Sequence, residues 1–109
     1  GHPCLDEMNA INESYADWQK ETGIKIYAVS LDDSRTKSRV QPLVNSSEWT
    51  YEVMLDENSD FKRAMGVNNP PHTFIIDSDG TILWQHAGYA QGDEQTMINK
   101  YKEIIANKK

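Results

Sequence analysis

Apolar side chains recur at steps of four, three, four and three residues near the start of the chain. The stripe consists of Cys4, Met8, Ile11, Tyr15 and Trp18. This period places its members on one face of an α-helix, because residues three and four apart are neighbours on a helix surface. We expect the helix to run from about Pro3 to about Glu21, since proline suits a first turn and Thr22-Gly23 is a typical stop.

A strand is expected directly after this helix. The run from Ile24 to Leu31 is apolar on both faces, which is typical of a central strand in a sheet covered on both sides. A second helix is predicted from about Ser34 to Ser46, with Ser34 as its cap. Pro42 should kink or restart it, because proline removes a backbone hydrogen bond.

The second half of the chain contains a clear hairpin pattern. Two apolar runs, Thr73 to Asp77 and Thr81 to Ala87, flank the turn sequence Ser78-Asp79-Gly80. A final helix should start with Asp93 as its N-cap. Its expected buried residues are Met97, Ile98, Tyr101, Ile104 and Ile105. The short elements expected before the hairpin are a strand, Glu52 to Leu55, and a helix, Ser59 to Met65.

Length and charge limit the function classes. The 109 residues fit one domain, residues 1–109, large enough for its own core. The net charge of −6 repels phosphate backbones and anionic lipid, so we expect no nucleic-acid or membrane partner. No apolar run approaches the roughly 18 residues of a membrane-spanning helix, and no signal peptide pattern is present.

Two segments carry the residues with the most chemistry. The first is Pro3-Cys4-Leu5-Asp6-Glu7, which holds the single cysteine at a helix start. The second is Asn69-Pro70-Pro71-His72-Thr73-Phe74-Ile75-Ile76-Asp77, a proline loop leading into a strand. With Ser30-Leu31-Asp32, Val53-Met54-Leu55-Asp56 and His86-Ala87-Gly88-Tyr89, in this order and spacing, the chain resembles the thioredoxin-like thiol-disulfide oxidoreductases of bacterial envelopes. The similarity is to the TlpA and ResA type, in the versions common in Bacteroidetes.

The resemblance implies the fold. It predicts a thioredoxin-like α/β fold with three α/β/α layers and a mixed sheet, lacking the N-terminal strand or strands. The chain would be the C-terminal portion, beginning at the second half of a Cys-x-Pro-Cys motif. Gly1 then stands where the family has its nucleophilic cysteine. Two strands would keep an unpaired inner edge, a liability that a folded protein must cover.

The resemblance also implies roles for Cys4 and Glu7. Cys4 corresponds to the resolving thiol, which attacks the mixed disulfide and releases reduced substrate. Glu7 lies three residues further on the same helical face and corresponds to an acid that moves a proton to or from Cys4 or tunes its pKa. The alternative is that Asp6 and Glu7 only complement the helix dipole. For Asp6 we prefer that alternative.

Pro70 and Pro71 are the expected substrate-binding residues. Pro71 matches the family's cis-proline, which turns the preceding backbone toward the dithiol so that an extended substrate can pair with it. Pro70 would shape the same surface. The alternative is an ordinary trans turn of the Asn-Pro type.

We expect no metal and no organic cofactor. His2, Cys4 and His72 could converge near the loop as copper ligands, but a fixed His pair is absent, and a tag remnant accounts for Gly1-His2. One cysteine cannot form an internal disulfide, so the cysteine count does not assign a compartment. A bacterial envelope, periplasmic location follows from the resemblance alone.

The functional expectation is disulfide exchange on protein or peptide thiols by the parent enzyme, which would also need an upstream redox donor. The fragment itself should be inactive alone, and in this truncated form a swapped dimer can form. The rival from another class is a redox-inactive thioredoxin-like module that only binds peptides. A peroxide-reducing enzyme is a third option, but the expected Pro-x-x-x-Thr-x-x-Cys signature is absent.

Overall fold

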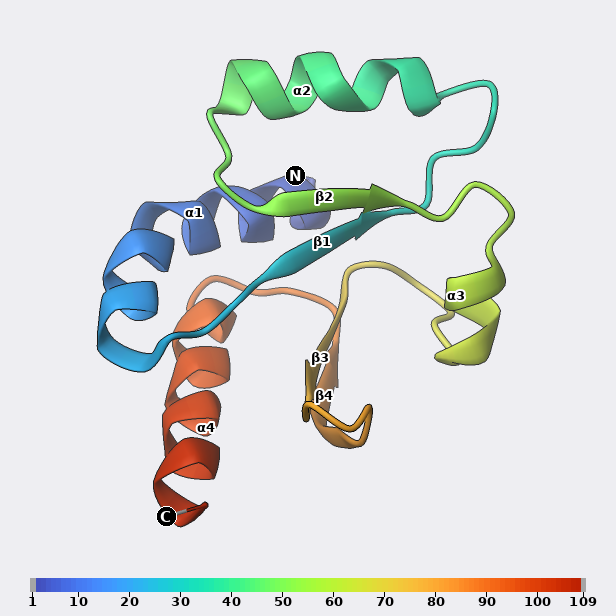
Figure 1. The fold of residues 1–109 in the computed structure, drawn as a ribbon. Helices are drawn as coiled ribbons and strands as arrows, with labels where there is room; N and C mark the ends of the chain where they lie inside the picture. The colour runs from blue at the N-terminus through green and yellow to red at the C-terminus, as the bar shows by residue number, and fades with distance from the viewer. Residues whose placement is uncertain (1, 109) are drawn as a thin grey trace. The chain divides into compact units, whose positions relative to one another are not determined.

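The structure is a computed structural model that describes residues 2–108, so Gly1, the predicted position of the nucleophile, lies outside the described residues. These residues form a mixture of helices and strands that ends in a hairpin and a helix (Figure 1). The elements are α1 (Pro3–Thr22), β1 (Tyr27–Ser30), the 3₁₀ helix η1 (Lys37–Arg39), α2 (Val40–Ser47), β2 (Glu52–Leu55), α3 (Asp60–Ala64), β3 (His72–Ile76), β4 (Ile82–Ala87) and α4 (Asp93–Asn107). Within residues 2–108, no helix is both long and apolar enough to cross a membrane.

The chain divides into two compact units. One unit combines Gly1–Ile11 with Asn69–Lys109, and the other comprises Asn12–Asn68. Residues of helix α1 belong to both units, and the extent of the helix, Pro3–Thr22, agrees with the predicted Pro3 to Glu21. Every candidate site residue from the sequence, Cys4, Glu7, Pro70 and Pro71, falls in the first unit.

The Asn12–Asn68 unit is built on a parallel pair of strands. β1 and β2 pair from Tyr27 opposite Glu52 to Ser30 opposite Leu55. Tyr15 and Trp18 of α1 are buried, and the Tyr15 ring lies 5.5 Å from the ring of Tyr51. The Tyr15 hydroxyl also accepts a hydrogen bond of 3.1 Å from the backbone N–H of Ile26, just before β1. The Tyr15 side chain thus links α1 to the segment that leads into β1.

The second helix starts later than predicted. Ser34 is not its cap: it lies in a turn where Asp33 accepts backbone hydrogen bonds from Arg35, Thr36 and Lys37. A 3₁₀ turn follows, and α2 begins at Val40. Pro42 is therefore in the first turn of α2, where its missing N–H leaves no hydrogen bond unmade. The helix therefore restarts near Pro42, as predicted, and its first residue is Val40.

Helix α3 is organised by a buried carboxylate outside it. Asp56 is buried and accepts hydrogen bonds from the backbone N–H groups of Phe61 and Lys62, at 3.0 and 2.9 Å. It satisfies first-turn donors that an N-cap side chain would otherwise bond. At the other end, Gly66 has a φ of +68°, a left-handed conformation that glycine adopts without strain.

The first unit is built on an antiparallel hairpin. β3 and β4 pair from His72 opposite Ala87 to Ile76 opposite Ile82, with a bulge between Ile75 and Ile76. Ile75 of β3 and Met97 and Ile98 of α4 are buried and form the core of this unit. The hairpin and the last helix confirm the sequence pattern, although Tyr101, Ile104 and Ile105 are only half-buried.

The sheet differs from the predicted form. Parallel and antiparallel pairing both occur, but in two separate two-stranded sheets within the described residues rather than in one mixed sheet. β1 was predicted to be covered on both sides, yet Tyr27 is 50% exposed and Val29 is 37% exposed. Tyr27 and Val29 point to the same face of the sheet, so it is this face that is not fully covered.

We predict that the apolar core of the first unit depends on Ile98, which has an exposed fraction of 0%. Truncating Ile98→Ala should lower the free energy of unfolding by about 2–5 kcal/mol, because it removes buried methylenes and leaves a cavity. Urea unfolding followed by circular dichroism measures this loss. Ile82→Ala, at a side chain that is 40% exposed, is the matched control and should cost far less. Equal losses in the two variants would contradict this core assignment.

We also predict that the β1–β2 sheet self-associates. One face of this sheet exposes Tyr27, Val29 and Met54, and within the described residues each of the two strands has a free edge, which invites pairing with a second copy. Sedimentation velocity should show a mass that rises with protein concentration. Val29→Lys should shift the population toward monomer, whereas Ser38→Lys, the same gain of charge on exposed η1, should not. Concentration-independent monomer in the unmodified chain would rule out this association.

Candidate active site around Cys4 and Glu7

Cys4 lies in the first turn of α1. The carbonyl of His2 accepts the first helical hydrogen bond, from the N–H of Asp6 at 2.9 Å, and Pro3 is the first helical residue. The thiol is free and half-buried. Burial raises the pKa of Cys4 above its ordinary value, and the nearby carboxylate of Glu7 raises it further. Cys4 therefore rests as a protonated thiol at neutral pH.

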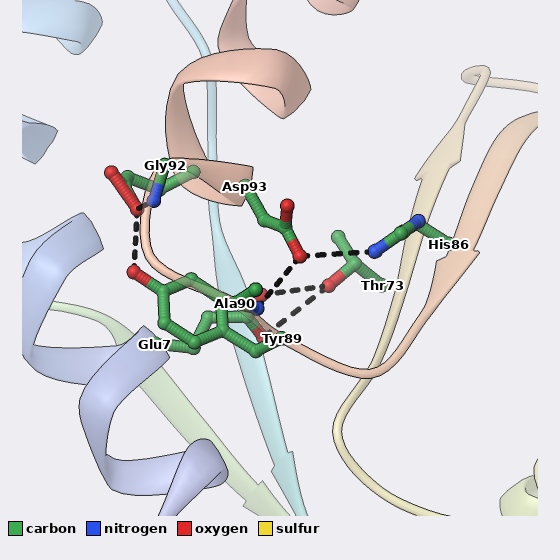
Figure 2. Close-up of polar contacts among 8 residues, drawn as sticks. Glu7, Thr73, His86, Tyr89, Ala90, Gly92 and Asp93 are labelled. Carbon is green, nitrogen blue, oxygen red and sulfur yellow. Dashed lines mark hydrogen bonds and ion pairs between the residues drawn. The ribbon is translucent and has the colours of Figure 1, made fainter.

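Glu7 is one helical turn beyond Cys4, and only 8% of its surface is exposed. The hydroxyl of Thr73 on β3 lies 3.3 and 3.4 Å from its two carboxyl oxygens, so it can donate to either one (Figure 2). Both distances exceed the usual ~2.7–2.8 Å for an O–H···O bond. Burial raises the pKa of Glu7, and this weak hydrogen bond opposes the rise only in part.

Two ordered carboxylates occupy the first turn of α4. An oxygen of Asp93 accepts from the N–H of Ala90 at 2.8 Å and pairs with Nε2 of His86 at 3.1 Å. The Ala90 hydrogen bond is the main reason why the pKa of Asp93 is lowered. Gly92, not the predicted Asp93, is the N-cap of α4, because its left-handed backbone lets the Asp93 side chain fold back onto the loop.

Glu94 makes the second set of contacts. Its Oε1 accepts a short hydrogen bond from the hydroxyl of Tyr89 and a 3.0 Å bond from the N–H of Gly92. The bond from Tyr89 lowers the pKa of Glu94, and the same bond raises the pKa of Tyr89 to about 12. Figure 2 shows these contacts beside Glu7, on the loop that joins β4 to α4.

The proline loop enters the same unit just before β3. The Pro70–Pro71 peptide bond is cis, the geometry that the resemblance implied for Pro71. The carbonyl of Pro71 accepts a 2.7 Å hydrogen bond from the N–H of Gly88, which ties the loop to the end of β4. Pro70 is exposed and Pro71 is half-buried, so the outer part of the loop is available to a ligand.

His2 and His72 both interact with other groups of the protein. His72 bonds Gln85 at 2.9 Å and stacks on Phe74 at 4.4 Å, and His2 accepts a long hydrogen bond from the N–H of Leu5. Among residues 2–108, no group of three or more histidine, cysteine or acidic side chains could hold a metal ion.

Sequence reasoning proposed Cys4 and Glu7 as site residues but did not include the residues around them. Thr73, His86, Tyr89 and Glu94 received no functional role. The available signal was the position of Glu7 itself. It lies three residues after Cys4 and four before Ile11, inside the apolar stripe, and a buried carboxyl there requires polar partners from other elements.

The arrangement places a half-buried thiol and a buried carboxyl one helical turn apart, each with a raised pKa. A carboxyl can act as a general acid when it is protonated, and its conjugate base can take a proton back.

The chain is similar to several known proteins. The sequence model of the AhpC/TSA family matches residues 2–85. The thiol-disulfide oxidoreductase ResA of Bacillus anthracis is 34% identical over 86 residues, which are 79% of this chain and 48% of that protein. The thiol:disulfide interchange protein DsbE of Vibrio cholerae is 28% identical over 97% of this chain and 55% of its own length. The chain thus spans about half the length of the curated relatives it matches.

Solved structures give the same fold. An uncharacterized thioredoxin-like protein from Porphyromonas gingivalis is 47% identical, with a TM-score of 0.83 over 97% of this chain and 69% of that one. A putative thiol:disulfide interchange protein DsbE from Chlorobium tepidum is 25% identical, with a TM-score of 0.77 over 97% of this chain and 71% of that one. The fold is therefore thioredoxin-like, and the chain belongs to the AhpC/TSA family.

Proposed function

We propose that this chain is part of a thiol-disulfide oxidoreductase that exchanges disulfides with protein or peptide substrates. The observation that carries the proposal is the buried carboxyl of Glu7, one turn from the Cys4 thiol and hydrogen-bonded by Thr73, two residues after Pro71. The names of the relatives ResA and DsbE support the same reaction class.

In this proposal Cys4 is the resolving thiol and Glu7 is its proton partner. When a thiolate attacks the sulfur bonded to Cys4, the S–S bond breaks and Cys4 leaves with the electron pair. The Glu7 carboxyl gives its proton to the Cys4 thiolate and becomes a carboxylate. In the opposite direction, the Glu7 carboxylate takes the proton from Cys4 before Cys4 attacks. The attacking cysteine of the parent enzyme would occupy position 1, where this sequence has glycine.

The proline loop is the proposed substrate-binding edge. An extended substrate would pair with the backbone beside Pro70 and Pro71. The hydrogen bond from Gly88 to the Pro71 carbonyl supports this role, because it holds the loop in one position. Resemblance to envelope oxidoreductases supports a bacterial cell envelope, periplasmic location.

A redox-inactive peptide-binding module is the second candidate. It is favoured by the glycine at position 1, which leaves Cys4 as the single cysteine of the sequence. The two candidates share the proline loop and differ in whether a second thiol, once supplied, gives turnover.

The 109-residue chain should not catalyse insulin reduction by dithiothreitol, because one cysteine can only form a dead-end mixed disulfide. Gly1→Cys should form a disulfide with Cys4, seen as a loss of two mass units and of both free thiols. It should also accelerate insulin precipitation, whereas the double variant Gly1→Cys with Cys4→Ser should not form this disulfide. A Gly1→Cys protein that forms the disulfide yet stays inactive while binding extended peptides would favour the binding module.

Glu7→Gln should change the release of Cys4 from a mixed disulfide with glutathione in a pH-dependent way. At low pH the wild-type carboxyl is protonated and can donate to the departing thiolate, so wild type should be faster, by about 10-fold or more for a full general acid. Above the raised pKa of Glu7, its carboxylate repels the thiolate, so the ratio of wild-type to variant rates should fall below one.

Mass spectrometry with 2-mercaptoethanol isolates the relevant step. Attack on the glutathione sulfur yields the free protein, whereas attack on Cys4 yields a 2-mercaptoethanol adduct. Glu13→Gln makes the same chemical change on an exposed position of α1 and should leave the rate unchanged at every pH. A rate ratio for Glu7→Gln that stays constant across pH would show that Glu7 serves only the helix dipole.

A further inference from the structure

The hydroxyl of Thr73 lies within hydrogen-bond distance of both carboxyl oxygens of Glu7, at 3.3 Å from one and 3.4 Å from the other (Figure 2). Thr73 is the second residue of β3, two residues after the cis-bonded Pro71. The hairpin holds its backbone, since Thr73 lies opposite His86 of β4. A β-branched side chain also has a restricted χ1 angle. The hydroxyl therefore reaches Glu7 from a fixed point on the strand.

A hydroxyl suits a carboxyl that gains and loses a proton. It has one hydrogen to donate and lone pairs that accept, so it can bond to the ionised carboxylate and to the protonated acid. A lysine or arginine in its place could only donate and would favour the charged form of Glu7. The nearly equal distances to the two oxygens of Glu7 allow the hydroxyl to donate to whichever oxygen lacks the proton.

We propose that Thr73 is a positioning residue that holds the Glu7 carboxyl in place in both of its protonation states, so that Glu7 can give a proton to Cys4 and take it back without moving away. The inference deepens the proposed function and rests on it. Glu7 is buried, so its carboxyl has little water to replace a lost hydrogen bond. The Thr73 hydroxyl then acts on the exchange through Glu7.

Other titratable groups around Glu7 act on it by charge. They are Cys4 on its own helix, His86 on β4, Tyr89 in the loop before α4, and Asp93 and Glu94 in the first turn of α4. Burial has the largest influence on the pKa of Glu7 and raises it, and the Thr73 hydrogen bond comes next and lowers it. Asp93 raises this pKa, His86 lowers it and Glu94 raises it, each by less than the Thr73 bond lowers it.

Three substitutions separate the hydroxyl of Thr73 from its packing. Thr73→Val removes the hydroxyl and keeps a β-branched side chain that strands favour, so this variant should fold. Thr73→Ser keeps the hydroxyl and loses the methyl group. Thr81→Val is the matched control, because it makes the same change at an exposed position near the turn of the hairpin.

The first measurement is a pH titration of the Glu7 carboxyl carbon by ¹³C NMR in the intact chain, with exposed Glu13 as the internal reference. Thr73→Val should move the Glu7 midpoint to higher pH, because the ionised carboxylate loses a donor. Thr73→Ser should stay close to the wild-type midpoint, and Thr81→Val should not move it. An unchanged midpoint in Thr73→Val, or an equal rise in Thr73→Ser, would overturn the inference.

The second measurement is the release of Cys4 from its mixed disulfide with glutathione at low pH. Glu7 is protonated there with or without the Thr73 hydroxyl, so a slower release reports a displaced carboxyl rather than a changed pKa. Thr73→Val should slow release about two- to fivefold, as expected for the loss of one weak hydrogen bond, and Thr73→Ser should restore the rate. In a Glu7→Gln background Thr73→Val should have no effect. A loss of the same size in that background would contradict the inference, because Thr73 would then act without Glu7.

Failure of the proposed function gives a different result. If Glu7→Gln releases Cys4 at the wild-type rate at every pH, there is no proton transfer for Thr73 to support. The titration of Glu7 needs no activity, so it reports the contact by itself. A midpoint that rises in Thr73→Val and returns in Thr73→Ser would still establish Thr73 as the residue that positions Glu7.

Discussion

The site depends on the burial of the Glu7 carboxyl, which is energetically unfavourable. Position 7 lies within the apolar stripe of α1, so a carboxyl there leaves water with the rest of that helix face. A buried carboxylate costs several kcal/mol unless it is paired, whereas a neutral carboxyl costs much less. Burial raises the pKa of Glu7 above its ordinary value, and the hydrogen bond from Thr73 is the main interaction that opposes this rise. The hydrogen bond from Thr73 then also ties α1 to β3 within one unit.

Patterns over a few residues predicted the helices and strands that depend mainly on neighbouring residues. The bounds of β2 agree with the predicted Glu52 to Leu55, and the turn at Ser78-Asp79-Gly80 joins β3 to β4 as expected. Periodicity and turn residues act over a few positions, which is why these predictions hold. The start of α2 was wrong because Asp33 captures the backbone donors around Ser34, a competition between two adjacent polar residues that periodicity does not report.

The division of the strands into two sheets could not be predicted, because strand pairing depends on segments that are distant in the sequence. An apolar run on both faces indicates a strand able to be central, and β1 has that composition. Whether it acquires two neighbours depends on segments far away in sequence. In the described residues it has one, which leaves one backbone edge of β1 without a strand partner. The same limit applies to the site: Cys4, Glu7 and Pro71 lie in recognisable short motifs, but the network of His86, Tyr89, Asp93 and Glu94 arises where a strand, a loop and a helix end meet.

The raised pKa values of Cys4 and Glu7 are linked, and the link has a chemical consequence. Part of the rise for Cys4 comes from the negative charge of Glu7, so a neutral Glu7 makes the Cys4 thiolate easier to form. An ionised Cys4 would in turn oppose ionisation of Glu7, so the pair resists carrying two negative charges at once. In the proposed function, the Cys4 sulfur must alternate between leaving group and nucleophile, and Glu7, one helical turn away, would supply the proton in one direction and take it back in the other.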